Sequence, residues 1–337
     1  MKAIQNNTDG TSQLVTIEEP KLGPKDVLIQ TLGCGLCGTD LLKINLKLLK
    51  KTTVLGHELV GRIVKKGAAV QDYNENELIV VAHHVPCFDC HYCTHGSFSM
   101  CDTFKTTNFV PGGFAEYICI PEAHLKHTTQ KIPDNMPWKE AIFMEPLACC
   151  VRSIDRLPLK NNDTILIVGL GSIGLMMTKL LKRLDCHIIG LDIDPERSEK
   201  SLTWGVDQAF ASVNDLVLEH IKSKTNNRGL DGIIFTAGPA TMLNESLSWI
   251  RNGGFVNLFS HLSGEVGPLD TSELYHRELQ IITSYSATPD SLVKSFNILK
   301  DENLGLANMF QEYPLQAFDQ AVSDMNTRTV LKSLIIF

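Results

Sequence analysis

The chain has 337 residues, of which 43% are hydrophobic and 20% charged, a composition typical of globular proteins and long enough for two domains. A net charge of −7 and the absence of any block rich in lysine and arginine argue against a nucleic-acid partner. No apolar run approaches the roughly 20 residues of a bilayer span, and the start MKAIQNN lacks the pattern of a secretory signal, so we expect a cytoplasmic protein.

Three short segments in the first half of the chain carry potential ligands for one metal ion. The sequence GLCGTD holds Cys37 between glycines, GHE supplies His57 and Glu58, and MEP supplies Glu145. A lone histidine or glutamate is more often structural, but a catalytic zinc uses three such side chains and keeps a fourth position open. The basic stretch 41–51 is too short to favour a membrane-surface helix, so we expect a local helix or loop there.

Four cysteines follow within residues 87–101 at the spacing C-x2-C-x2-C-x7-C. Two-residue gaps let a turn bring successive thiolates to one tetrahedral zinc ion, and four protein ligands leave no place for substrate. Two disulfides or an iron–sulfur cluster are the alternatives, but cytosolic thiols stay reduced and clustered cysteines there more often bind zinc. The predicted ligands of a structural zinc are Cys87, Cys90, Cys93 and Cys101.

A nucleotide-binding loop is predicted at residues 169–174. An apolar, β-branched run at 164–168 leads into GLGSIG, and an apolar stretch at 175–184 indicates a helix. In G-x-G-x-x-G the first glycine allows a tight turn, the second lets the backbone approach a pyrophosphate, and the third lets the helix pack on the strand. The predicted cofactor contacts of this loop are Gly169, Gly171, Ser172, Ile173 and Gly174.

A second predicted strand, 187–191, ends at Asp192, 18 residues after the last glycine of the loop. A carboxylate there accepts hydrogen bonds from the adenosine ribose and repels a 2′-phosphate, which favours NAD over NADP. Arg197 is a further candidate contact, either as a partner of that phosphate or as a surface charge that covers the adenine. The simplest alternative for Asp192 is a helix N-cap ahead of Pro195.

Strand-like segments recur at 208–211, 232–235, 255–259 and 279–283, with helix-like segments between them. This alternation predicts a doubly wound sheet of six parallel strands. Because strand ends in such sheets contact the ligand, the further cofactor candidates are Thr236, Ala237 and Ser260. The C-terminal segment 330–337 is predicted to be a strand that returns to the first domain.

Taken in order, these motifs resemble the zinc-dependent medium-chain dehydrogenase/reductase superfamily, and within it the polyol (sorbitol-like) and threonine dehydrogenase branches. The resemblance covers the whole chain and also includes PGGFAEY at 111–117, EPL at 145–147 and LDID at 191–194. It implies an α/β protein with two domains. A GroES-like, mainly β catalytic domain would comprise 1–146 and 286–337, and a Rossmann NAD-binding domain would comprise 147–285.

The resemblance also implies roles for the ligand-bearing residues. Cys37, His57 and either Glu58 or Glu145 would hold the catalytic zinc. Asp40 would accept the other imidazole N–H of His57 and so fix its tautomer. Thr39 would contact the alcohol oxygen and begin the proton relay, and the substrate pocket would include Thr39 and Glu145 together with Tyr117 and Tyr285.

Two positions depart from the pattern of this superfamily. Many alcohol and polyol dehydrogenases carry a histidine three residues after the relay hydroxyl, where this chain has Leu42. The proton then leaves through Glu145 and water or through the cofactor ribose, with His84 as another candidate beside the site. Ser284 precedes Tyr285 where sorbitol dehydrogenases of the mammalian type tend to show arginine, which weakens a claim for sorbitol itself.

The resemblance implies an oxidoreductase that transfers a hydride between NAD and a secondary alcohol of a polyol, cyclitol or sugar derivative. The alternatives are an enzyme like L-threonine 3-dehydrogenase and, in another class, a catalytically silent zinc- and nucleotide-binding protein. Expected cofactors are one catalytic zinc, one structural zinc and NAD rather than NADP. Expected partners are a small alcohol or ketone and a second copy of the chain, in a homodimer or homotetramer formed through an edge strand near 279–285, with neither nucleic acid nor membrane.

Overall fold

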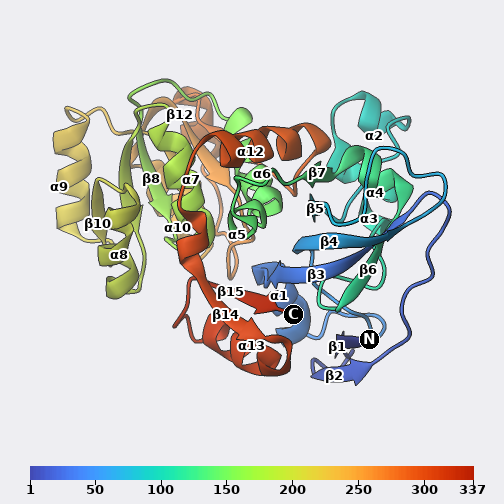
Figure 1. Cartoon of the computed structure of the whole chain (residues 1–337). Coiled ribbons are helices and arrows are strands. Elements are labelled where there is room, and N and C mark those ends of the chain that lie inside the picture. The colour runs from blue at the N-terminus through green and yellow to red at the C-terminus, as the bar shows by residue number, and fades with distance from the viewer. The chain divides into compact units, whose positions relative to one another are not determined.

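The computed structural model describes residues 1–337, and the chain divides into two compact units, coloured along the chain in Figure 1. Unit 1 combines the two ends of the chain, Met1–Ala148 and Ala287–Phe337. Unit 2 is the continuous segment Cys149–Ser286. None of the helices is both long and apolar enough to cross a bilayer.

Unit 1 is built on a mostly antiparallel sheet in the order β14-β15-β3-β4-β5-β7, with β6 also paired to β3. The C-terminal β15 lies antiparallel beside β3, within the segment predicted to be a returning strand (Figure 1). A separate antiparallel pair joins β1 and β2. The strands are β1 (Lys2–Asn6), β2 (Ser12–Thr16), β3 (Val27–Gly35), β4 (Glu58–Lys66), β5 (Leu78–Val81), β6 (Tyr117–Ile120), β7 (Thr129–Lys131), β14 (Phe310–Pro314) and β15 (Lys332–Ile336).

Among the helices of unit 1, α1 positions two of the residues singled out from the sequence, Cys37 and Asp40. Its N-cap is Cys37, whose sulfur accepts the backbone N–H of Thr39, while the Asp40 carboxylate accepts the N–H of Cys37 in return. Such a reciprocal cap satisfies backbone donors that the first turn cannot pair. The helices are α1 (Gly38–Asn45), α2 (His91–Thr94), α3 (Asp102–Thr106), α4 (Glu122–His127), α5 (Trp138–Ala141), α12 (Pro289–Asp301) and α13 (Phe318–Asn326), while α6 (Met144–Asp155) begins in unit 1 and ends in unit 2.

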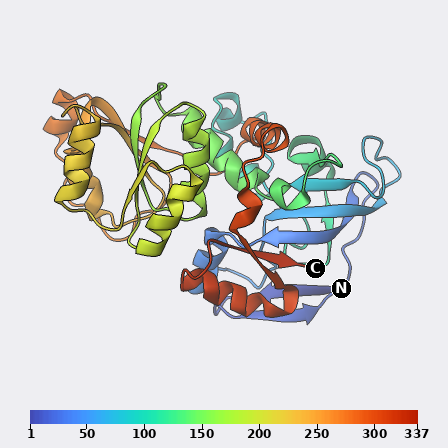
Figure 2. The same cartoon turned by 60° about the vertical axis from the view of Figure 1, so that its left-hand side comes forward.

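Unit 2 contains the predicted doubly wound sheet, with six parallel strands in the order β10-β9-β8-β11-β12-β13. Helices cover both of its faces (Figure 2). The chain reverses its direction of progress between β8 and β11, and ligands in such sheets bind outside the carboxyl ends of the strands at this point. The elements are β8 (Thr164–Val168), β9 (His187–Leu191), β10 (Gln208–Phe210), β11 (Leu230–Phe235), β12 (Ile250–Leu258), β13 (Gln280–Thr283), α7 (Ser172–Lys182), α8 (Pro195–Ser201), α9 (Asp215–Lys224), α10 (Thr241–Leu247) and α11 (Thr271–His276).

The amino ends of the strands in unit 2 are joined by the buried carboxylate of Asp231. Its oxygens accept the backbone N–H of Thr164 at 2.8 Å, Nε of Arg251 at 2.6 Å and Nη2 of Arg228 at 3.2 Å. Each strand-initial segment thereby gains a charge-assisted hydrogen bond inside the fold. A single side chain at the start of β11 thus connects the starts of β8 and β12.

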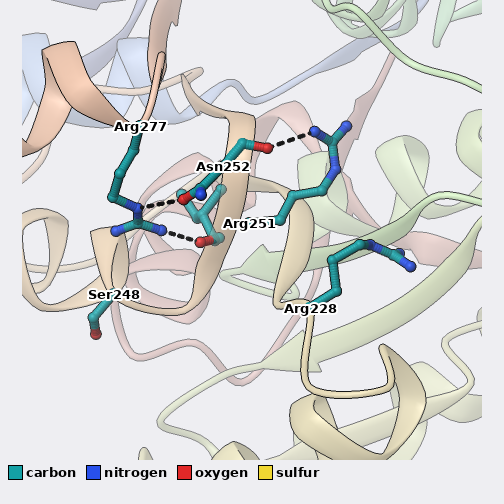
Figure 3. A pocket seen from close by; sticks show the side chains of 6 residues that line it. Arg228, Ser248, Arg251, Asn252 and Arg277 are labelled. Carbon is teal, nitrogen blue, oxygen red and sulfur yellow. Dashed lines mark hydrogen bonds between the residues drawn. The ribbon is translucent and has the colours of Figure 1, made fainter.

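A cavity of about 630 Å³ lies at the same end of the sheet and is lined by three arginines (Figure 3). Arg277 donates to the side chain of Asn252 and to the carbonyl of Ile250, and Arg251 donates to the carbonyl of Asn252. These guanidinium groups are therefore engaged by protein acceptors. The cavity lies at the amino ends of the strands, away from the carboxyl ends where a nucleotide is expected, and we assign it a structural role.

Replacing Asp231 by alanine removes the acceptor of a buried backbone N–H and of two arginines. We expect the free energy of unfolding to fall by roughly 1–3 kcal/mol, the cost of leaving such donors unpaired. Asp231→Asn keeps an oxygen for Thr164 and is expected to lose less. Thermal and urea denaturation followed by circular dichroism measures both, and an unchanged transition in Asp231→Ala contradicts the role given to this carboxylate.

Candidate active site and metal centres

The four cysteines of residues 87–101 converge on one point in unit 1. Cys90 precedes α2 and Cys101 precedes α3, so two helix starts present their thiols to the same centre. The sulfur separations are 3.9 Å for Cys87 to Cys93, 3.6 Å for Cys90 to Cys93 and 3.6 Å for Cys101 to Cys87. Bonds of 2.3 Å to a tetrahedral zinc require sulfurs ~3.8 Å apart, so the arrangement fits this ion.

Backbone donors support the same cysteine cluster. The N–H of Cys90 donates to the sulfur of Cys87 at 3.4 Å, and the N–H of Cys87 donates to the sulfur of Cys101 at 3.5 Å. Although burial opposes it, hydrogen bonds from the backbone N–H groups of Cys87 and Phe104 and from neighbouring thiols lower the pKa of Cys101 to about 6. Burial raises the pKa of Cys93 to about 12. Zinc binds thiolates, so an ion here would release the proton that Cys93 otherwise keeps.

A second cluster of potential ligands is formed by Cys37, His57 and Glu58. Their ligand atoms all lie within 4.8 Å of one another. Cys37 is fixed as the N-cap of α1, and Glu58 is the first residue of β4. Gly56, with φ at 91°, makes the turn that leads into His57. A thiolate, an imidazole and a carboxylate at this spacing form a donor set that suits a catalytic zinc.

Asp40 lies behind His57, as a residue that orients the imidazole should. Its Oδ1 is 3.4 Å from Nδ1 of His57, and its Oδ2 accepts the N–H of Cys37. Burial lowers the pKa of His57, but the charges of Asp40 and Cys37 outweigh it and raise that pKa well above its ordinary value. Burial likewise raises the pKa of Asp40, and the charge of His57 reverses the effect. With Nδ1 directed at Asp40, Nε2 is the nitrogen left for a metal.

Glu58 has a partner that the sequence analysis missed. Nζ of Lys332, at the start of β15, lies 2.9 Å from Oε1 and 2.7 Å from Oε2 of Glu58, and both side chains are buried. Burial alone would lower the pKa of Lys332, but the charge of Glu58 raises it. Gly35 makes room for this pair, because a Cβ there would lie 2.3 Å from Oε2 of Glu58. The one sequence signal for this partner is a single lysine in an otherwise largely apolar C-terminal strand, where a charge requires a buried counter-charge.

The other predicted residues of this region lie around the cluster. Thr39 is exposed, and its hydroxyl donates to the sulfur of Cys37 at 3.3 Å. Glu145 is buried at the start of α6, and its charge acts on Lys332, but its carboxylate is outside the group whose ligand atoms lie within 4.8 Å. Tyr117 begins β6, and Leu42 is 48% exposed on α1.

His84 belongs to a row of stacked rings. The ring of His83 lies 4.6 Å from that of His57 and 3.6 Å from that of His84, which continues to Phe104 at 4.8 Å. Nδ1 of His84 is 3.0 Å from the carbonyl of Thr107. Burial is the main cause that lowers the pKa of His84 to about 4 and that of His83 well below its ordinary value. Both rings are therefore neutral near pH 7, and His84 is packed rather than presented to the cluster of Cys37, His57 and Glu58.

In unit 2 the glycine-rich loop has the conformation that its sequence predicts. Gly169 has φ at 93°, a value that favours glycine. A Cβ on Gly174 would lie 2.0 Å from the carbonyl oxygen of Gly169, so only glycine lets α7 pack this closely on β8. Gly171 is the N-cap of α7, where Ser172 and Ile173 open the first turn. The loop therefore presents the amino end of an eleven-residue helix, the arrangement that binds a pyrophosphate.

Asp192 and Arg197 lie next to this loop. The carboxylate of Asp192 accepts the N–H of Leu170 at 2.8 Å and that of Asp194 at 3.0 Å, so it is fixed at the end of β9. Asp194, rather than Asp192, is the N-cap of α8. A Cβ on Gly171 would lie 3.8 Å from Nη1 of Arg197, and Nε of Arg197 lies 3.9 Å from Asp194.

The three remaining cofactor candidates follow neighbouring strands. Thr236 and Ala237 come after β11, and their N–H groups donate to the carbonyl of Val168 at the end of β8. The Thr236 hydroxyl also donates to the carbonyl of Gly169. Ser260 comes after β12, and its buried hydroxyl has no protein partner. Tyr285, a predicted pocket residue, is 61% exposed after the edge strand β13.

Comparison with known protein families adds an independent observation. Residues 23–134 match the family described as alcohol dehydrogenase GroES-like domain, and residues 172–300 match the family described as zinc-binding dehydrogenase. Together these matches span most of the chain and include both ligand clusters. The chain belongs to the zinc-dependent medium-chain dehydrogenase superfamily. The predicted combination of a GroES-like domain with a Rossmann sheet is confirmed.

Individual relatives of this dehydrogenase narrow the branch. It is 29% identical to sorbitol dehydrogenase from Bacillus subtilis (strain 168), over 83% of this chain and 81% of the relative. It is 26% identical to D-arabitol-phosphate dehydrogenase from Enterococcus avium, over 99% and 97%. Relatives named L-threonine 3-dehydrogenase match a smaller share of this chain.

A solved structure supports the fold of this dehydrogenase over its whole length. Galactitol-1-phosphate dehydrogenase from Escherichia coli superposes with a TM-score of 0.87 at 23% identity and covers 100% of both chains. The predicted superfamily and its polyol branch are confirmed by these matches. The protein is an oxidoreductase acting on CH–OH groups, of a family that uses zinc and a nicotinamide cofactor.

The Glu58–Lys332 pair generates a prediction about the stability of this dehydrogenase. In the metal-free protein, Lys332→Met leaves a buried carboxylate without its counter-charge, and we expect the free energy of unfolding to fall by about 3–5 kcal/mol. In the double variant Lys332→Met with Glu58→Gln no charge is left unpaired, so much of the loss should return. Urea denaturation of the three proteins measures this, and a double variant no more stable than the single one contradicts the assignment.

Proposed function

We propose that this dehydrogenase oxidises a secondary alcohol of a polyol, cyclitol or sugar derivative with NAD and carries out the reverse reduction of the ketone. The observation that carries the proposal is the cluster of Cys37, His57 and Glu58 in a chain that also holds the nucleotide loop. The printed activities of the sorbitol and D-arabitol-phosphate dehydrogenases support the substrate class. We assign catalysis to residues 1–146 with 286–337 and cofactor binding to 147–285.

We further propose one catalytic and one structural zinc in each chain. Cys37 and His57 would hold the catalytic ion together with Glu58 or Glu145, and the four cysteines of 87–101 would hold the structural ion. When bound, the catalytic ion acts as a Lewis acid toward the substrate oxygen, and the nicotinamide accepts the hydride. Lys332 affects which of these two carboxylates is available as the third zinc ligand, because its ammonium group already contacts both oxygens of Glu58.

The residues around the cluster have separate tasks in this proposal. Asp40 holds the imidazole of His57 with Nδ1 turned away from the metal position. Thr39 places a hydroxyl beside Cys37, where it would accept the proton of the substrate alcohol while passing its own proton on. Because Thr39 is exposed, water can receive the proton that the hydroxyl releases, and no histidine is needed at Leu42.

The proposed cofactor is NAD rather than NADP. Asp192 is held at the end of β9 by two backbone N–H groups, the position from which a carboxylate accepts the ribose hydroxyls. A 2′-phosphate would bring negative charge next to it. Arg197 lies close to Gly171 and its charge partly offsets this repulsion, so we propose it as a contact of the adenosine. Gly169, Ser172, Ile173, Gly174, Thr236, Ala237 and Ser260 complete the proposed cofactor contacts.

We also propose that the protein is a homodimer or homotetramer. The strand β13 is at the edge of its sheet, and Ile281 on it is 36% exposed. An edge strand with unpaired backbone groups is a template for pairing with a second copy. The partner of catalysis would be a small alcohol or ketone.

The two proposed zinc ions can be counted. Elemental analysis of the purified protein is expected to give two zinc ions per chain. Cys37→Ser and Cys93→Ser should each give one, because a tetrahedral site rarely keeps its ion after losing a thiolate. Cys149→Ser, a half-buried cysteine outside both clusters, is the matched control and should keep two. A single zinc in the unaltered protein contradicts the catalytic site.

The activity is tested by NADH formation with polyols, cyclitols, polyol phosphates, simple secondary alcohols and L-threonine, with NAD and NADP in parallel. We expect turnover of polyols or their derivatives with NAD, lost on incubation with a zinc chelator and in Cys37→Ser. Asp192→Ala should narrow the preference for NAD over NADP. Turnover confined to L-threonine would replace the proposed substrate class, and a protein with two zinc ions that oxidises none of these compounds would refute it.

A further inference from the structure

Lys43 lies in the last turn of α1, the helix whose N-cap, Cys37, belongs to the cluster of Cys37, His57 and Glu58. Lys43 follows Thr39 by four residues, and residues with this spacing lie on the same face of a helix with Cβ atoms about 5–6 Å apart. Long side chains on a helix point back toward its N-terminus and cover the preceding turn. The N-cap of α1 is Cys37, so we expect the side chain of Lys43 to run toward Thr39 and the cluster of Cys37, His57 and Glu58.

The electrostatic effect of Lys43 on its neighbours agrees with this placement. After burial and the charges of His57 and His84, the charge of Lys43 is the next cause that lowers the pKa of His83. The same charge contributes, after burial and the charge of His57, to the lowered pKa of His84. Burial raises the pKa of Asp40, and the charge of Lys43 helps to lower it, behind the charge and hydrogen bond of His57. Lys43 is therefore close enough to the cluster to act on three residues around His57.

The ammonium group of Lys43 has no hydrogen-bonding or ion-pair partner within the protein, although the side chain is half-buried. The other lysines nearby are accounted for differently, because Lys332 is neutralised by Glu58 and Lys47 packs beside Gly10 and acts on Asp9. A cation in the last turn of a helix gains only about 0.3–1 kcal/mol from the helix dipole, which any exposed lysine there would also gain.

We propose that Lys43 binds an anionic group on the substrate, a phosphate monoester or a carboxylate, so that the substrates of this enzyme are acidic derivatives of polyols. The inference rests on the proposed function and narrows it. A lysine without a protein partner, one helical turn after Thr39 in α1, suits an anion a few bonds from the reacting carbon. Since the contact is to one flexible point charge, phosphate and carboxylate are both suitable ligands.

The test compares matched pairs of substrates in the unaltered enzyme and in variants. The pairs are sorbitol with sorbitol 6-phosphate, galactitol with galactitol 1-phosphate, and galactitol with L-galactonate. We expect the anionic member of a pair to be preferred. Lys43→Met should lower its kcat/KM about 10- to 100-fold, mainly through KM, and leave the neutral member unchanged. Lys43→Arg should restore most of the preference, and Lys50→Met, which removes an exposed lysine beyond α1, should have no effect.

The phosphate and carboxylate arms separate the two sources of the anion. Preference for the phosphate esters identifies a polyol phosphate as substrate, and preference for L-galactonate identifies a sugar acid. Equal use of neutral and anionic members, unchanged in Lys43→Met, overturns the inference while leaving the proposed function intact. A rise in the KM for NAD alone in Lys43→Met also overturns it, because the lysine would then serve the cofactor.

A second measurement does not depend on turnover. Acylation of lysines by a small reagent, mapped by mass spectrometry, reports the access of Lys43 relative to Lys50. Sorbitol 6-phosphate or L-galactonate is expected to protect Lys43 and not Lys50, whereas sorbitol should protect neither. Absence of protection by either anion overturns the inference even if the enzyme proves active. Protection without turnover of any compound would support the anion contact and count against the proposed function.

Discussion

The buried ion pair of Glu58 and Lys332 is the interaction on which the cluster of Cys37, His57 and Glu58 depends. Glu58 begins β4 and directly follows His57, so any displacement of this carboxylate moves a proposed ligand. A carboxylate at this depth is stable only with a counter-charge, because the penalty for removing it from water is several kcal/mol. Lys332 provides that charge from the other end of the chain. The sheet order that places β15 next to β3, and β3 next to β4, is what brings the two together.

The same constraint organises the smaller features around it. Gly35 has no side chain where the Glu58 carboxylate lies, and Cys37 follows two residues later as the cap of α1. Three residues later, the carboxylate of Asp40 accepts the backbone N–H of Cys37 with one oxygen and faces His57 with the other. The negative charges of Cys37, Asp40 and Glu58 are thus gathered around one imidazole, opposed within the protein by Lys332 and at longer range by Lys43. A site with this excess of donors is suited to a divalent cation.

Much of unit 2 could be predicted from the sequence, because its signals are local. The apolar run of β8, the glycines that follow and the strand that ends at Asp192 are contiguous, and their order determines a doubly wound sheet. The four cysteines are likewise close in sequence, so their convergence follows from turns alone. Lys332 could not be identified in this way. Its partner lies 274 residues away, and only the pairing of β15 with β3 reveals it.

The position of His84 illustrates the other limit. The sequence places a polar side chain close to the proposed ligands along the chain. Whether that side chain faces solvent or is packed depends on its ring contacts with His83 and Phe104, and these contacts form only in the folded chain. Glu145 is similar, since its distance from the ligand atoms is set by where α6 begins. The third ligand of the proposed zinc site, Glu58 or Glu145, therefore stayed open at the level of sequence.

The place of β15 at the end of the chain has a consequence for synthesis on the ribosome. Unit 2 is continuous and can complete its sheet as soon as Ser286 has emerged. Unit 1 begins first but is completed later, because Glu58 gains its counter-charge only once Lys332 has been synthesised. Until then the nascent chain carries a complete unit 2 sheet beside a unit 1 that lacks β15. A chain interrupted before Lys332 would thus retain its unit 2 sheet but leave the Glu58 carboxylate without its buried partner.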